Sequence, residues 1–166
     1  MNHWLMKSEP DEFSIDALAK KKSEPWSGVR NYQARNYLRE MRKGDGVLFY
    51  HSSCAEPGVV GIATVATAAY PDPTQFDPRS DYFDAKATHA TPRWSLVDVK
   101  FKRKLKRVIA LTELKSRAEL QGFALIHRGN RLSVLPVTAA QWDFILGLES
   151  CRTSAKNRRN SPPNAR

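Results

Sequence analysis

Apolar positions along the chain recur at two spacings, which predict short strands separated by short helices. Ala34, Tyr37, Leu38 and Met41 repeat at the interval of one buried helix face, and Gly44 follows as a stop signal. Runs of apolar and β-branched residues predict strands at 3–7, 47–50, 59–67, 94–101, 105–109 and 131–136. About six strands with helices inserted between them favour a mainly β fold of the α+β class: a small, strongly curved sheet or barrel with peripheral helices.

Polar residues that can cap helices occur where helices are predicted to begin. Ser14 is a candidate N-cap for a helical turn over 14–18, and Lys20–Pro25 is expected to be a solvated connector. Two capping boxes are predicted, Ser116 with Glu119 and Thr138 with Gln141. The glycine at position 61 inside the run 59–67 indicates a bulge or a close approach of another element.

Residues 71–92 form a long loop rich in proline, aspartate and aromatic residues, and a loop of this length is often functional. After Glu149 the apolar pattern stops. We therefore expect one domain over residues 1–150 and a basic, disordered tail over 151–166.

The net charge of the chain indicates a class of binding partner. The formal net charge of the 166 residues is +10, and half of it lies in the tail. The domain is thus moderately basic, which favours a polyanion such as nucleic acid. Neither a membrane span nor a signal peptide is evident, and Cys54 and Cys151 are predicted to be free thiols. A cytoplasmic protein without membrane, metal or cofactor is expected, associated with the nucleoid if DNA is the target.

Templates for catalysis are weak. Gly44-x-Gly46 lacks a third glycine and follows a helix, and the four histidines show no metal-ligand spacing. His51 and Cys54 are the best candidates for reactive groups, but two residues of one loop do not make a triad.

Two polar and aromatic blocks carry the stronger signal. Lys7-Ser8-Glu9 continues from the first predicted strand, and Trp26-Ser27-Gly28 leads into Arg30-Asn31-Tyr32 at a predicted helix start. An indole face, hydrogen-bonding groups and one carboxylate suit a flat polar ligand such as a nucleobase.

These blocks resemble the EVE domain family over residues 3–148. The resemblance also covers Gly58–Ala63, Ala69–Pro73, Phe76–Pro78, Pro92–Trp94 and Arg131–Val134. It implies a PUA-like β-barrel ringed by helices, related to the YTH and ASCH groups, with a pocket for a modified nucleobase. In related DNA-reading domains that base is flipped out of the duplex. Ser27 stands where this family often has an acidic residue.

The resemblance, carried over to this sequence, implies a base pocket and phosphate contacts. The pocket residues are Lys7, Ser8, Glu9, Trp26, Val29, Asn31, Tyr32, Tyr50, His51, Ser52, Leu132 and Ser133; the phosphate-binding residues are Arg30, Arg35 and Arg131. The leading hypothesis is a non-enzymatic reader of a modified base in DNA or RNA. Two alternatives stay open: an enzyme acting on RNA or a nucleotide, and a module for small molecules or proteins.

Overall fold

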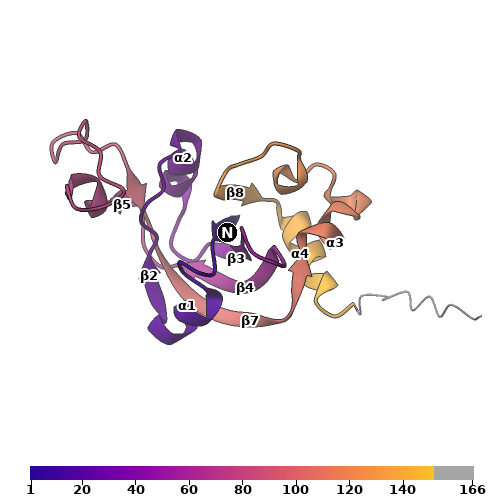
Figure 1. Cartoon of the computed structure of the whole chain (residues 1–166). Coiled ribbons are helices and arrows are strands. Elements are labelled where there is room, and N and C mark those ends of the chain that lie inside the picture. The colour runs from indigo at the N-terminus through magenta and orange to yellow at the C-terminus, as the bar shows by residue number, and fades with distance from the viewer. Residues whose placement is uncertain (152–166) are drawn as a thin grey trace, which may run out of the picture.

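A six-stranded sheet that curls into a half-barrel forms the centre of the molecule (Figure 1). The computed structural model describes residues 1–151, so the predicted tail lies almost wholly outside the described residues. The strand order is β2-β7-β4-β3-β1-β8. The six strands are β1 (His3–Ser8), β2 (Ser23–Pro25), β3 (Gly46–His51), β4 (Gly58–Val65), β7 (Asp98–Ala110) and β8 (Val134–Val137).

The first strand is an inner one, because β1 pairs in parallel with β3 and antiparallel with β8. All other pairs in this sheet are antiparallel. Register shifts interrupt the β3–β4 and β4–β7 pairings, and such bulges increase twist and allow a sheet to curl. The mainly β fold predicted from the sequence is confirmed.

Helices cover both faces of the sheet. Consecutive strand residues point to opposite sides, so each face carries its own apolar side chains. α1 (Ile15–Lys21) and α2 (Tyr32–Glu40) bury their apolar side chains in one hydrophobic cluster with Trp4 and Met6. α3 (Leu111–Lys115) and α4 (Ala139–Leu148) contribute to a second cluster with Leu5. Two 3-10 turns, η2 (Ala118–Leu120) and η3 (Ala124–Ile126), connect α3 toward β8. Among the described residues, no helix is both long and apolar enough to cross a membrane.

Three of the four local predictions about helix starts and close approaches are confirmed. Ser14 caps α1 by accepting a hydrogen bond from Ala17, and Thr138 and Gln141 form a capping box at α4. A side chain at residue 61 would collide with Ile15, so the glycine there lets α1 lie directly on the sheet. The capping box predicted at Ser116 is wrong: Ser116 ends α3, and its hydroxyl donates back to the carbonyl of Glu113.

Two strand predictions are also corrected. β7 is one strand of 13 residues where the sequence pattern predicted two, because the cations between residues 100 and 107 hide the strand alternation. Ser23–Pro25, predicted to belong to a solvated connector, forms the edge strand β2 and pairs with β7. β2 thereby fixes the position of Trp26, whose amide donates to the carbonyl of Val97 at 2.9 Å.

The long loop predicted over residues 71–92 is tied to the domain at both ends. β5 (Tyr70–Pro71) pairs with β6 (Ser95–Leu96), and η1 (Pro73–Phe76) follows β5 directly. The buried side chain of Gln75 accepts from the amides of Arg93 and Trp94 and donates to the carbonyls of Asp72 and Trp94. In Figure 1 the loop projects beside α2 from the end of the molecule opposite α3 and α4.

Asp72 fixes this loop to the segment that precedes α2. Its carboxylate is fully buried and accepts hydrogen bonds from the Gly28 amide at 2.8 Å, from Arg30 at 3.0 Å and from Thr74 at 2.9 and 2.6 Å. Burial by itself would raise the pKa of Asp72, but these donors outweigh it and hold the pKa below its usual value. The buried group is therefore a charged carboxylate at neutral pH.

Replacing this carboxylate should be costly, because Asp72→Ala leaves the partly buried Arg30 without its counter-charge. We expect a loss of about 3–5 kcal/mol in the free energy of unfolding, measured by urea denaturation. The exposed pair of Asp16 with Lys104 provides the control, since Asp16→Ala should cost only about 0–1 kcal/mol. Equal losses for the two variants would contradict the role given to Asp72.

Candidate functional site

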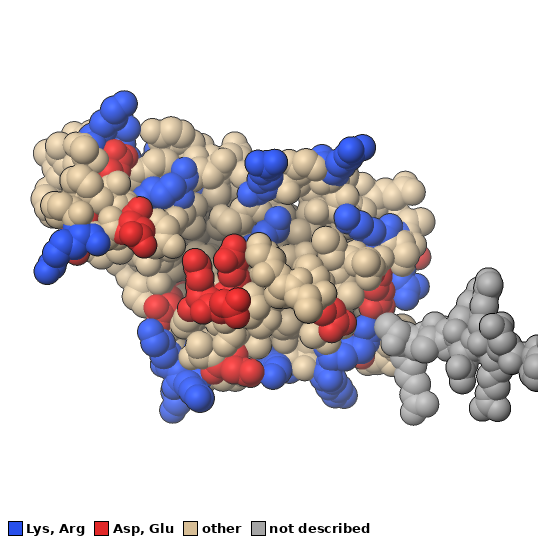
Figure 2. Space-filling view, in the orientation of Figure 1, with Lys and Arg blue, Asp and Glu red and all other residues tan. Residues whose placement is uncertain are grey.

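A cavity of about 800 Å³ opens between the end of β1, the α1–β2 connection and the segment before α2. Figure 2 shows this face of the molecule, which is hollowed near its middle, with acidic and basic side chains on the rim. Its volume falls within the range of pockets that hold small ligands. The lining residues are Lys7, Ser8, Glu9, Glu12, Phe13, Lys21, Glu24, Pro25, Trp26, Ser27, Gly28, Val29, Arg30, Asn31, Ser52, Tyr82, Arg131 and Ser133.

Trp26 forms an apolar wall of this cavity from within the core. Its ring packs edge-to-face on Phe49, with centroids 5.5 Å apart, and on Phe13 at 6.2 Å. The side chain is only 8% exposed, so these neighbours fix its orientation and leave a small part of the indole to a ligand. The indole thus serves both the core and the cavity.

A tight turn at the end of β1 supplies polar groups on one side of the cavity. The Ser8 hydroxyl donates to the Phe13 carbonyl at 2.6 Å, and the Glu9 carbonyl accepts from the Glu12 and Phe13 amides. The exposed carboxylates of Glu9 and Glu12 therefore stand at the mouth, and neither has a hydrogen-bond partner within residues 1–151.

Two further segments complete the polar lining that the sequence predicted. The Asn31 oxygen caps α2 by accepting from the Ala34 amide, which leaves the Asn31 NH₂ group to a ligand. Ser133 lines the cavity just before β8, and its carbonyl accepts the Lys7 amide at 2.8 Å. Backbone pairing at the end of the sheet thus brings residues from both ends of the chain to one hollow.

Tyr82 is a wall residue that the sequence analysis missed. It comes from the long loop and lies against Gly28, which has a positive φ of 87°; a Cβ atom there would lie 2.7 Å from the Tyr82 ring. Gly28 is therefore required both by its backbone conformation and by this close packing. The aromatic residues of the loop were a signal, but nothing in the sequence indicated their distant partner.

The guanidinium of Arg30, predicted to bind phosphate, is fully occupied within the protein. It donates to the carbonyls of Val29 and Tyr82, to Asp72 and to the Thr74 hydroxyl, in five hydrogen bonds of 2.8–3.0 Å. A guanidinium has five N–H donors, so none is left for a ligand. Arg30 therefore holds the loop in place and forms part of the cavity lining.

The remaining charges of the cavity are mixed in sign. Lys21 pairs with Glu24 at 2.9 Å. Lys7 has no carboxylate partner within residues 1–151, and partial burial lowers its pKa from the usual lysine value. Arg131 is exposed at the rim and also lacks such a partner among these residues. Unpaired cations and carboxylates in one hollow suit a polar heterocycle better than a bare phosphate group.

Tyr32 and Arg35, both predicted site residues, lie outside the cavity lining. The Tyr32 ring stacks on Trp94 with centroids 4.8 Å apart, and the Arg35 guanidinium lies 4.7 Å from the Tyr32 ring centre. Arg35 also donates to the Arg93 carbonyl at 3.0 Å. This stack joins α2 to the base of the long loop.

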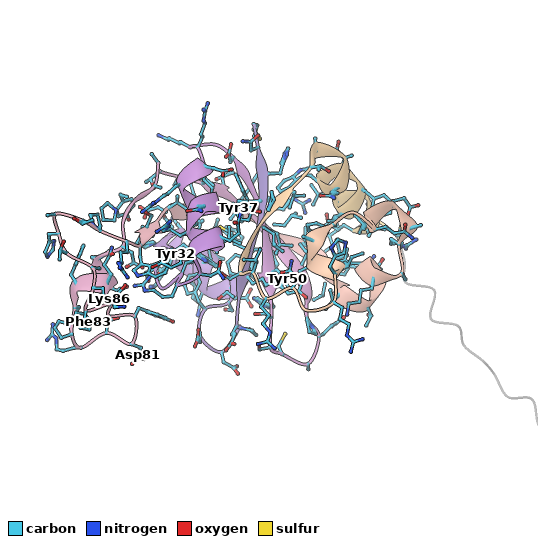
Figure 3. The ribbon with its side chains drawn as sticks, turned by 90° about the horizontal axis from the view of Figure 1, so that it is seen from above. Tyr32, Tyr37, Tyr50, Asp81, Phe83 and Lys86 are labelled. Atoms are coloured by element: carbon cyan, nitrogen blue, oxygen red, sulfur yellow. The ribbon has the colours of Figure 1, made fainter. Side chains whose placement is uncertain are left out.

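Tyr50, His51 and Leu132 also lie outside the lining, although Ser52 next to them belongs to it. Tyr50 points into the second hydrophobic cluster because its neighbour Phe49 points into the first, and burial raises the pKa of Tyr50 to about 12. Figure 3 shows Tyr50 in the sheet, to the side of Tyr32 and Tyr37 on α2. The His51 Nε2 atom accepts the Ile15 amide at 3.1 Å, so it caps the start of α1.

Other sites are less developed in the described part of the chain. A second hollow of about 610 Å³ near the N-terminus has no aromatic residue in its lining. Within residues 1–151, no group of three or more histidine, cysteine or carboxylate side chains is placed to hold a metal ion.

Comparison with known proteins points to one family. The model of the EVE domain matches residues 2–148. Human thymocyte nuclear protein 1 is 44% identical over 167 residues, which covers 89% of this chain and 74% of the human protein. A crystal structure of a protein from Pseudomonas putida is 55% identical with a TM-score of 0.87, covering 89% of this chain and 99% of that one.

A further solved structure contains a nucleic acid. The human THYN1 protein, crystallised in complex with 5-methylcytosine-containing DNA, is 42% identical to this chain with a TM-score of 0.88. The match covers 92% of this chain and all of that one.

Gly28→Ala should distort the cavity wall, since it forces a side chain into a left-handed backbone conformation and against Tyr82. We expect a loss of about 1–3 kcal/mol in unfolding free energy. Gly122→Ala, at a position with open space and an ordinary φ, should be nearly neutral in the same chemical denaturation experiment. Comparable losses would argue against the close packing of Gly28 with Tyr82.

His51 should make stability depend on pH. Burial lowers the pKa of His51 and Lys104 adds to this, while Asp16 opposes it. The folded state then binds fewer protons than the unfolded state, so stability should fall as pH drops from about 6.5, the unfolded-state pKa, through the lower pKa of folded His51. His51→Gln keeps a neutral acceptor and should make the melting temperature less dependent on pH between pH 7 and 5.5. His127→Gln, at an exposed position, should retain the pH dependence of the wild-type protein. An unchanged slope in His51→Gln would refute this assignment.

Proposed function

Since the chain belongs to the EVE domain family, we propose that it is a non-enzymatic module that binds a modified nucleobase in DNA, with 5-methylcytosine as the first candidate. The observation that carries the proposal is the cavity walled by Trp26 and rimmed by unpaired polar groups. The THYN1 complex with 5-methylcytosine-containing DNA supports this ligand class.

Within the cavity, the base would lie against Trp26, while Ser8, Asn31 and Ser133 bind its polar edge. Stacking of a base on an aromatic side chain contributes about 1–3 kcal/mol but does not discriminate between bases. Discrimination therefore depends on hydrogen bonds to the edge and on the space beside the modified position.

Glu9 is the group we assign to a cytosine-type base. A carboxylate accepts from the exocyclic N4 amine of cytosine, whereas thymine presents a carbonyl at that position and would be repelled. Glu9 is exposed at the cavity mouth and engages no other side chain within residues 1–151, so its oxygens are accessible to such an amine.

Arg131 and Lys7 are the cations that we assign to phosphates next to the bound base. Both line the cavity, and neither is neutralised by a carboxylate among the described residues. Arg35 lies farther out on α2, where it would meet a phosphate beyond Tyr32. These contacts add affinity that falls with rising salt concentration and carry no sequence information.

Access to a base inside a duplex requires that it leave the stack, which costs a few kcal/mol. The phosphate contacts and the contact with the exposed part of Trp26 oppose this cost. A target base that is already unpaired does not incur this cost. The cavity should therefore bind single-stranded DNA at least as tightly as duplex DNA.

Binding fits the site better than turnover. His51, the best candidate for a reactive base in the sequence, uses its Nε2 atom to cap α1, and Cys54 is not part of the cavity lining. We therefore propose no catalytic residue and no cofactor. With DNA as the target, the expected location is the cytoplasm, at the nucleoid.

The test measures binding of labelled oligonucleotides that carry cytosine, 5-methylcytosine, thymine or N6-methyladenine at one target position, by fluorescence anisotropy at low salt. We expect tightest binding to 5-methylcytosine, and Glu9→Gln should reduce discrimination against thymine by about 1–3 kcal/mol. Glu119→Gln, an exposed residue outside the cavity lining, is the matched control. Equal affinity of the wild-type protein for every oligonucleotide would refute the proposal.

A further inference from the structure

One aromatic side chain on the long loop is exposed without an evident reason in the fold. Tyr32, Tyr70, Tyr82 and Phe83 are the exposed aromatic residues within residues 1–151. The first three have partners: Tyr32 stacks on Trp94, the Tyr70 hydroxyl bonds to Asp98, and Tyr82 packs on Gly28. The Phe83 ring is 42% exposed and contacts no aromatic or cationic group in the described part of the chain.

The backbone on both sides of Phe83 is held firmly. The Tyr82 carbonyl accepts two hydrogen bonds from Arg30, at 3.0 and 2.8 Å. The Asp84 amide donates to the Gln75 carbonyl at 3.0 Å, and the Asp84 carboxylate accepts the Trp94 indole N–H at 2.8 Å. Phe83 is therefore presented in a fixed position, which lowers the entropy that binding would cost.

The position of Phe83 relates it to the cavity. Its neighbour Tyr82 is a wall of that cavity, so Phe83 lies one residue beyond the wall. Figure 3 shows Asp81, Phe83 and Lys86 together at the outer end of the loop, beyond Tyr32 and far from Tyr50. A molecule too large to enter the cavity would meet this end of the loop.

A DNA duplex whose base has moved into the cavity has a gap in its stack where that base was. Such a gap is apolar on its upper and lower faces, and proteins that open base steps often place an apolar side chain between them. We infer that Phe83 inserts into the duplex as a wedge and occupies the space left by the extruded base. This inference rests on the proposed function and concerns duplex DNA only.

The wedge and the cavity make different demands on the ligand. A single strand has no closed stack to open, so the cavity alone determines its binding. Binding to a duplex depends on both the cavity and the wedge. Binding to a duplex with a mispaired target base depends less on the wedge, because less energy is required to extrude that base.

The experiment uses the full chain and one 5-methylcytosine oligonucleotide as a single strand, a matched duplex and a duplex mispaired at the target. 2-Aminopurine next to the target reports unstacking. Phe83→Ala should weaken matched-duplex binding by about tenfold or more and abolish the 2-aminopurine signal, while single-strand affinity changes by less than about twofold. The loss should be smaller on the mispaired duplex.

Matched variants separate this effect from others. Tyr70→Ala removes a ring of similar exposure outside the cavity and should leave the duplex-to-single-strand affinity ratio unchanged. Lys86→Ala changes a charge on the same loop and should affect all three ligands alike. Retained single-strand binding shows that Phe83→Ala is folded.

The outcomes also separate the two proposals. If Phe83→Ala weakens single-strand and duplex binding equally, or weakens neither, the wedge is refuted while the cavity proposal stands. If the wild-type protein shows no preference for 5-methylcytosine on either ligand, the proposed function itself fails.

Discussion

The buried carboxylate of Asp72 is the interaction on which the candidate site depends. It joins the Gly28 backbone and the Arg30 side chain to the first turn of the long loop, and the bonds from Arg30 to Thr74 and Tyr82 reinforce this connection. A buried charge is tolerated only when its hydrogen-bonding capacity is filled, and here four donors fill it. The hydrogen bonds to this one carboxylate thus form the cavity wall and hold the loop against the domain.

This arrangement also decides the electrostatic character of the cavity. Arg30 neutralises Asp72 and has no donor left for a ligand, so the most central cation of the site contributes shape rather than attraction. The charges that face the hollow without a partner among the described residues are positive at Lys7 and Arg131 and negative at Glu9 and Glu12. A site of this kind selects by complementary edges and excludes ligands that offer only negative charge.

Local signals in the sequence predicted much of this structure, and long-range contacts explain what they missed. Ser8 follows a predicted strand and Asn31 begins a predicted helix, so nearby residues indicated their surroundings, and both line the cavity. Trp26 lines it too, although the strand that places it, β2, was not predicted. Tyr50 lies outside the cavity lining because one step along a strand reverses the side chain. The approach of Tyr82 to Gly28 arises from pairing between distant segments, which no local pattern encodes.

The two outermost strands of the curled sheet affect how readily separate molecules associate edge to edge. β2 has three residues and β8 has four, and each contains a proline, Pro25 and Pro136. A proline has no amide hydrogen to offer to an incoming strand. Short edges interrupted in this way offer few amides to an incoming strand, so association of two copies through β2 or β8 is disfavoured.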